Sequence, residues 1–293
     1  MKLYNLNIFL KAVFLNLLAW ALLPVMDGMA KYLSSELPVV QIIWARYFFM
    51  VIFTLPFYLV FFQKKFLIPK NIPIQILRSV FLFISTICFF YAISIISLTE
   101  ALALAFIYPM ISTLLSSIIL KEKVGHKRWI AVFFGFVGAL IIIRPGFEII
   151  RFASLAGVGT GVFYAFYVIS TKKLSNDTPF LTLTFSGLVG AIIISIFVPV
   201  AWISPSYHQW IIMISMAIVG TLGHFFLILS LKFADASKLA PLGYFEIVTN
   251  IIISYYFFND FPDLWVWIGL VIIIASGIYI SVRENINKSY IKS

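Results

Sequence analysis

The chain has 293 residues, of which 62% are hydrophobic and only 11% are charged, and its formal net charge is +10. A soluble domain carries roughly a quarter charged residues, so this composition excludes a water-covered surface and predicts a protein embedded in lipid. Because the apolar residues form long runs and do not alternate with polar ones, we expect helical spans and not a β-barrel.

Ten apolar stretches are about as long as the roughly 20 residues that a helix needs to cross a bilayer core. In chain order, the expected spans are 8–33, 39–62, 74–96, 99–120, 127–144, 153–172, 179–202, 208–231, 237–258 and 263–282. The links are short, and Thr99 is placed to act as the N-cap of the fourth span. The expected fold class is therefore an all-α membrane protein with ten transmembrane helices, forming one membrane domain.

Basic residues are distributed unevenly over the two faces that these spans define. The face with both termini holds seventeen of the 21 Lys and Arg residues, Arg78 among them, whereas the opposite face holds Lys31, Arg144 and Arg151. Basic loops stay in the cytoplasm, so we expect a multi-pass protein with both termini cytoplasmic. Attraction to anionic lipid headgroups accounts for the positive charge, and no nucleic-acid partner is needed.

The two halves of the chain resemble each other. The run KYLSSELP (31–38) aligns with KKLSNDTP (172–179), and a slightly smaller offset aligns the later parts of the halves. With the halves taken as 1–145 and 146–293, each contains five expected spans. An odd number of spans reverses the direction of the second half, so we predict two inverted repeats, with a solute bound near mid-membrane as in many secondary transporters. A duplicated scaffold or channel without alternating access is the alternative.

Charged side chains inside the spans need an explanation, because each costs at least about 2.5 kcal/mol to insert into lipid. Glu246 lies in the ninth span. Under the offset that places Thr99 on Ser237, its counterpart in the first half is Tyr108, and we expect the two to face each other at the centre, where a substrate would bind. We expect Glu246 to bind a cationic group or a coupling proton; the alternative is a carboxyl hydrogen-bonded to a neighbouring helix. His224, at nearly the same depth in the eighth span, either pairs with Glu246 or packs as a core histidine.

Two further charges lie toward the other ends of the first and second spans. An ion pair between Asp27 and Arg46 would reduce the cost of burying either one. Arg46 is expected to have a structural or gating role, whereas Asp27 is a candidate to receive a cationic solute. Pro24, Pro109 and Pro241 lie inside spans, where each removes a backbone hydrogen bond and favours a kink or a gating movement.

Aromatic residues in the spans are candidates to stack on a ring or a cation of the solute. The best placed is Tyr244, two residues before Glu246, and the others are Trp20, Tyr91 and Tyr164. Most of the aromatic residues are instead expected to face lipid or the membrane interface.

Small residues predict where helices approach each other closely. Gly157 and Gly161 form a G-x-x-x-G motif on the sixth span, which favours tight helix packing over ligand binding. Gly220 and Gly223, just before His224, indicate a second close helix contact.

Several longer runs resemble a known family. They are DGMAKYLSSELP (27–38), WARYFF (44–49), LRSVFLF (77–83), the stretch 108–145, APLGYFEIV (240–248) and FNDFPD (258–263). Over essentially its whole length the chain resembles the EamA-type branch of the drug/metabolite transporter superfamily. Within that branch the runs are most similar to bacterial S-adenosylmethionine uptake proteins, and riboflavin carriers share the end motifs.

The resemblance implies a secondary transporter of a bacterial inner membrane for a small organic metabolite, such as the cationic, ring-bearing S-adenosylmethionine, working without a cofactor. Riboflavin transport and the export of amino acids or other metabolites are the alternatives within the superfamily. The resemblance does not say whether the protein is a monomer or a homodimer.

Other classes of function find little support in the residues. No Gly-x-x-x-x-Gly-Lys-Ser/Thr loop is present, so an ion gradient or solute exchange would have to drive transport. With three His, one Cys (Cys88) and no His-Glu-x-x-His helix, we expect neither a metal site nor an intramembrane enzyme. A passive channel remains the alternative from a different class.

Overall fold

The structure is a computed structural model and is almost entirely helical where it is described. It describes residues 2–61, 69–119, 130, 133–134, 137–138, 140–142, 148–174, 177–233, 242–243 and 245–276. The helices are α1 (Lys2–Ser34), α2 (Val39–Phe61), α3 (Ile72–Ile95), α4 (Leu98–Ala105), α5 (Tyr108–Ile119), α7 (Glu148–Lys173), α8 (Pro179–Phe197), η2 (Val198–Ala201), α9 (Tyr207–Phe233), α11 (Phe245–Phe258) and a helix over Leu264–Ser276.

Helix lengths and composition agree with the predicted membrane fold. In the described ranges, six helices are long and apolar enough to cross a membrane, and α11 and Leu264–Ser276 are shorter apolar helices. These elements are compatible with ten spans. Most of the fifth expected span (127–144), residues 237–241 and 244 at the start of the ninth, and the end of the tenth (277–282) lie outside the described residues.

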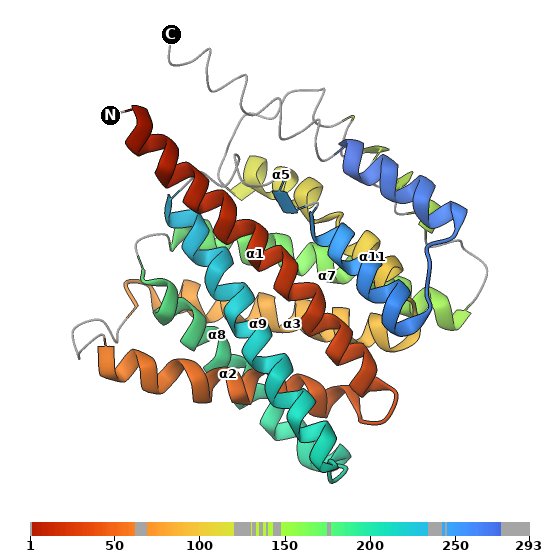
Figure 1. Cartoon of the computed structure of the whole chain (residues 1–293), viewed down its shortest axis with the longest axis horizontal. Coiled ribbons are helices and arrows are strands. Elements are labelled where there is room, and N and C mark those ends of the chain that lie inside the picture. Colours follow the sequence, from red (N-terminus) through yellow and green to blue (C-terminus); the bar gives the residue numbers. More distant parts are fainter. Residues whose placement is uncertain are drawn as a thin grey trace.

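The helices of the two halves interleave (Figure 1). The red α1 lies along the cyan α9, and α3 packs along α7, while α2 packs on α8. In the repeat, α1 corresponds to α7 and α3 to α9, so the α1–α9 contact and the α3–α7 contact are equivalent. This exchange is the arrangement that a pseudo-two-fold axis between inverted halves produces.

The fourth expected span is divided into two helices. α4 ends at Ala105 and α5 begins at Tyr108, with a turn over Phe106 and Ile107 between them. Pro109 explains this break, because it has no N–H to donate to the carbonyl of Ala105 four residues earlier. Pro24 does not have this effect, since α1 continues through it.

The predicted N-cap of this span is wrong by two residues. Ser97 caps α4, and its Oγ accepts a hydrogen bond from the Glu100 backbone N–H at 3.1 Å. Thr99 is instead buried inside the helix, where its hydroxyl donates to Asn250 Oδ1 of α11 at 3.2 Å. The hydroxyl therefore joins the two halves and does not begin a helix.

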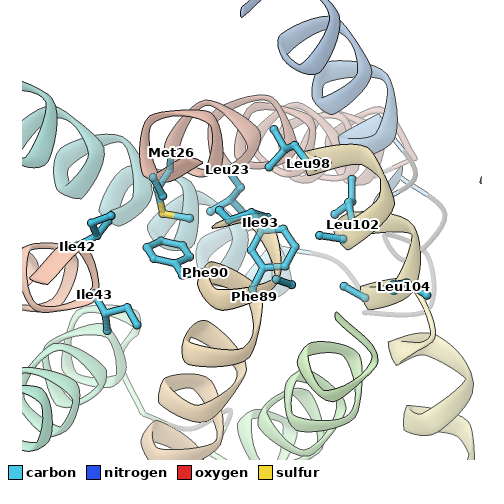
Figure 2. Packing of buried hydrophobic residues seen from close by; sticks show 14 of the residues in the cluster. Leu23, Met26, Ile42, Ile43, Phe89, Phe90, Ile93, Leu98, Leu102 and Leu104 are labelled. Atoms are coloured by element: carbon cyan, nitrogen blue, oxygen red, sulfur yellow. The ribbon is translucent and has the colours of Figure 1, made fainter. Parts of the chain in front are cut away.

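Apolar side chains from several helices meet in one continuous core (Figure 2). Leu23 and Met26 of α1 and Phe89 and Phe90 of α3 belong to it, together with Leu102 of α4. Because the surroundings of a membrane protein are also apolar, close packing and not hydrophobic burial holds such helices together.

Glycines set the closest approach between α7 and the α4–α5 break. A Cβ added to Gly161 would lie 2.5 Å from the Ala105 carbonyl oxygen, and one added to Gly157 would lie 3.0 Å from Leu104. Gly220 and Gly223 of α9 pack on Met26 and Leu23 of α1. These contacts confirm the predicted packing role of both glycine pairs.

Gly161→Ala is therefore expected to destabilise the protein. The added methyl group meets a backbone oxygen, which cannot rotate away, so overpacking should cost about 1–3 kcal/mol. The check is the melting temperature of the purified variant in detergent. Gly159→Ala, two residues away on α7, is the matched control because its Cβ would meet only the Cys88 side chain, at 3.3 Å. Equal melting temperatures for the two variants would contradict the predicted close contact.

Candidate functional site

A cavity of about 630 Å³, counted to its open mouth, lies among helices of both halves. It is lined by Trp20, Leu23, Met26, Asp27, Arg46, Leu82, Ser85, Thr86, Phe89, Leu102, Ala105, Phe106, Tyr108, Thr160, Tyr164, His224 and Glu246. The structure thus brings together six of the predicted residues and adds Arg46; the six are Trp20, Asp27, Tyr108, Tyr164, His224 and Glu246.

Two carboxyl groups face this cavity from helices of different halves. Asp27 of α1 and Glu246 of α11 are both buried, with 5% and 8% of their surface exposed. In the part of the chain that the structure describes, neither carboxyl forms a hydrogen bond or a salt bridge. They are close enough to repel each other when both are ionised. Such a pair is stabilised by any cation that enters between them.

Arg46 of α2 contributes a guanidinium group to the cavity wall. Its Nη1 donates to Thr86 Oγ1 at 2.9 Å, and its Nη2 lies 2.8 Å from His224 Nε2. The rings of Tyr47 and Phe90 flank the guanidinium, each with its centroid 5.4 Å from Cζ. α2, α3 and α9 therefore meet at this one side chain.

Aromatic rings form part of the cavity wall. Trp20 donates its indole N–H to Asn16 Oδ1 at 2.9 Å, which fixes the ring within α1. Tyr108 and Tyr164 contact each other edge to face, with ring centroids 5.1 Å apart. Rings held in this way present faces on which a flat or cationic solute can stack.

The structure corrects two predicted pairings. Within the described residues, Asp27 makes no salt bridge with Arg46, although the charge of Arg46 still acts on it across the cavity. His224 contacts Arg46 in place of Glu246. The cause is the same in both cases, since Thr86 of α3, which the sequence did not single out, turns the guanidinium toward α3 and α9.

The remaining candidates lie away from the cavity or outside the described residues. Tyr91 is 41% exposed on the outside of α3 and is not a lining residue. Tyr244 and Pro241 lie outside the described residues, and Pro109 is described only as part of the α5 backbone.

One residue that the sequence reasoning placed wrongly is Arg78. It was counted as a basic residue of a membrane face, but it is fully buried in α3. Its guanidinium donates to Thr171 Oγ1 (2.6 Å), Ser186 Oγ (2.9 Å), Tyr167 OH (2.9 Å) and the Thr182 carbonyl (3.3 Å). Its position near the start of a span resembles that of a snorkelling interface residue, so no sequence signal separated the two.

Metal chemistry has no evident ligand set here. In the ranges given above, no three His, Cys, Asp or Glu side chains come together in a way that could hold a metal ion.

A helical membrane bundle with charged side chains at a cavity between its two halves is typical of membrane transport proteins. The chain belongs to the EamA-like transporter family, whose sequence pattern matches it twice, over residues 8–144 and 151–282. The family and the relatives below are transporters and not enzymes.

Individual relatives span nearly the whole chain at modest identity. The S-adenosylmethionine uptake transporter of Rickettsia prowazekii is 29% identical over 93% of this chain and 94% of its own length. The riboflavin transporter of Vibrio cholerae is 26% identical, covering 89% of both chains. One solved crystal structure has the same fold, with a TM-score of 0.64 over 92% of this chain and 95% of its own, at 16% identity.

Proposed function

We propose that the protein is a secondary transporter that moves a small organic cation with a ring system, such as S-adenosylmethionine, by alternating access. Two inverted five-helix repeats, with a boundary near residues 145–146, would rock around the cavity between them. We further propose that it lies in a bacterial inner membrane with both termini in the cytoplasm, as the basic residues favour.

The observation that supports this proposal is the pair of carboxyls that face the cavity without a partner among the described residues. Asp27 and Glu246 come from opposite halves, so a cation between them would contact both moving parts. Trp20, Tyr108 and Tyr164 supply ring faces beside them. The names of the Rickettsia relatives, which take up an adenosyl sulfonium compound, agree with this chemistry.

Riboflavin is the second candidate, because an aromatic wall also suits its flat ring and a relative carries that name. Riboflavin has no cationic group, however, and it would leave both buried carboxyls uncompensated. Buried charges without partners are costly, so the site favours a cation.

Counterflow in reconstituted vesicles is the test. Vesicles preloaded with unlabelled S-adenosylmethionine should accumulate the labelled compound transiently, because a carrier returns to the outer face faster when it is loaded. Vesicles without preloaded solute should show slow equilibration only, and an excess of riboflavin should not compete. Equal entry with and without preloading would indicate a channel and contradict alternating access, and absence of any entry would remove S-adenosylmethionine as the solute.

A further inference from the structure

Arg46 is a buried cation that is only partly used by the protein. It has five N–H groups, and two of them reach Thr86 and His224. In the described part of the chain the other three form no hydrogen bond, and no carboxylate pairs with the group. Arg46 is only 7% exposed, and it lines the cavity. A guanidinium that served only to join helices would be expected to use its donors on them.

The contact with Arg46 also determines the state of His224. A guanidinium can only donate, so His224 Nε2 must accept and cannot carry a proton. The imidazole is therefore neutral, with its proton on Nδ1. Nδ1 is itself buried and has no hydrogen-bond partner among the residues that the structure describes. His224 thus holds the planar guanidinium of Arg46 in place and adds no charge to the cavity.

The cavity consequently has two poles of opposite charge. Asp27 and Glu246 form one, and Arg46 forms the other. With both carboxyls ionised, two negative charges against one positive charge leave a net charge of −1. A solute with two cationic groups and one carboxylate would neutralise this set group by group. A simple cation would leave the donors of Arg46 without a partner.

Thr86 and His224 occupy equivalent positions in the two repeats. They are separated in the chain by the same offset as Tyr108 and Glu246, so the repeat relates the members of each pair. Arg46 bonds to both Thr86 and His224, and therefore lies where the two halves meet. An anion bound to Arg46 would therefore interact with both halves.

We propose that Arg46, positioned by Thr86 and His224, binds the carboxylate of a solute whose cationic groups face Asp27 and Glu246. This inference rests on the proposed function and narrows its substrate class to amino-acid-bearing cations. The flat fork of Arg matches the two oxygens of a carboxylate, and Lys does not supply that geometry. Arg46 is then the specificity-determining residue, and His224 is a positioning residue.

Two compounds that differ only in the carboxylate test the proposal. S-adenosylmethionine and its decarboxylated form share the sulfonium, the amine and the adenosine. Purified protein should bind the decarboxylated compound about tenfold or more weakly, since a charge-assisted bidentate contact is lost. In Arg46→Lys the two affinities should converge, chiefly because S-adenosylmethionine binds less well.

His224 gives a second test that keeps Arg46 intact. His224→Gln retains an acceptor for the guanidinium and should preserve the discrimination between the two compounds. His224→Leu removes the acceptor and should reduce the ratio of the two affinities. A purely structural histidine would lower the melting temperature without changing the ratio of affinities.

The outcomes separate this inference from the proposed function. Equal binding of the two compounds by the wild type, or an unchanged ratio in Arg46→Lys and His224→Leu, would overturn the carboxylate site and leave the cation transporter standing. Binding of neither compound, together with counterflow of an uncharged solute, would overturn the proposed substrate and this inference with it.

Discussion

Glu246→Gln is expected to abolish concentrative uptake of S-adenosylmethionine while the protein still folds and inserts. The substitution keeps the size of the side chain but removes the charge that would face the cationic group. Losing one partner of a buried charge pair costs about 2–5 kcal/mol, which corresponds to roughly 30-fold to several-thousand-fold in affinity. Uptake of labelled compound into vesicles, with protein amount measured in parallel, is the assay.

Matched variants show whether the effect belongs to the cavity. Glu36→Gln makes the same chemical change at an exposed carboxyl outside the cavity, which accepts a hydrogen bond from Gln209. It should transport normally. Glu246→Asp keeps the charge on a shorter side chain and should retain part of the activity. Near-normal uptake by Glu246→Gln would remove this residue from the substrate site.

Several cavity residues could be predicted from the sequence because they are polar or charged within apolar spans. In runs of Ile, Leu and Phe, a residue such as Glu246 or Asp27 stands out, and the cost of burying it demands a reason. The repeat then gave a position for Tyr108, since an offset that aligns the two halves also aligns the residues that meet at their interface. Both steps need only local composition and spacing.

The partners of these residues could not be predicted in the same way. Arg46 bonds to Thr86, 40 residues away, and to His224, 178 residues away. Hydroxyls such as Thr86 are common in membrane helices, so nothing in the sequence marks the one that redirects a guanidinium. The predicted pairing of Arg46 with Asp27 was based on charge alone. Charge does not indicate how α2 is rotated about its axis, and therefore does not indicate which neighbours Arg46 contacts.

Arg78 shows the same limit and also leads to the second large effect. It lies one turn before the cavity residue Leu82 on α3, and its partner Tyr167 lies one turn after Tyr164 on α7. The guanidinium also stacks over the Tyr167 ring, 4.4 Å from its centroid. Its hydrogen bonds therefore join α3 of the first half to α7 and α8 of the second, next to one end of the cavity.

Arg78→Ala is expected to lower the melting temperature of the protein more than any substitution of an exposed residue. Hydrogen bonds from a charged group contribute about 1.5–3 kcal/mol each, but removing an unpaired buried charge also recovers part of its desolvation cost. The net loss should then be about 2–4 kcal/mol. Thermal unfolding in detergent measures it, and Lys232→Ala, at an exposed site on α9, is the control.

Arg78→Lys separates charge from geometry. A lysine ammonium keeps the positive charge but cannot reach four acceptors that are spread over two helices, so we expect it to recover less than half of the lost stability. Full stability in Arg78→Ala would mean that the cost of burying the guanidinium equals everything its hydrogen bonds contribute. Arg78 would then contribute nothing to the free energy of unfolding. Transport rates of the variant would have to show whether it has a functional role.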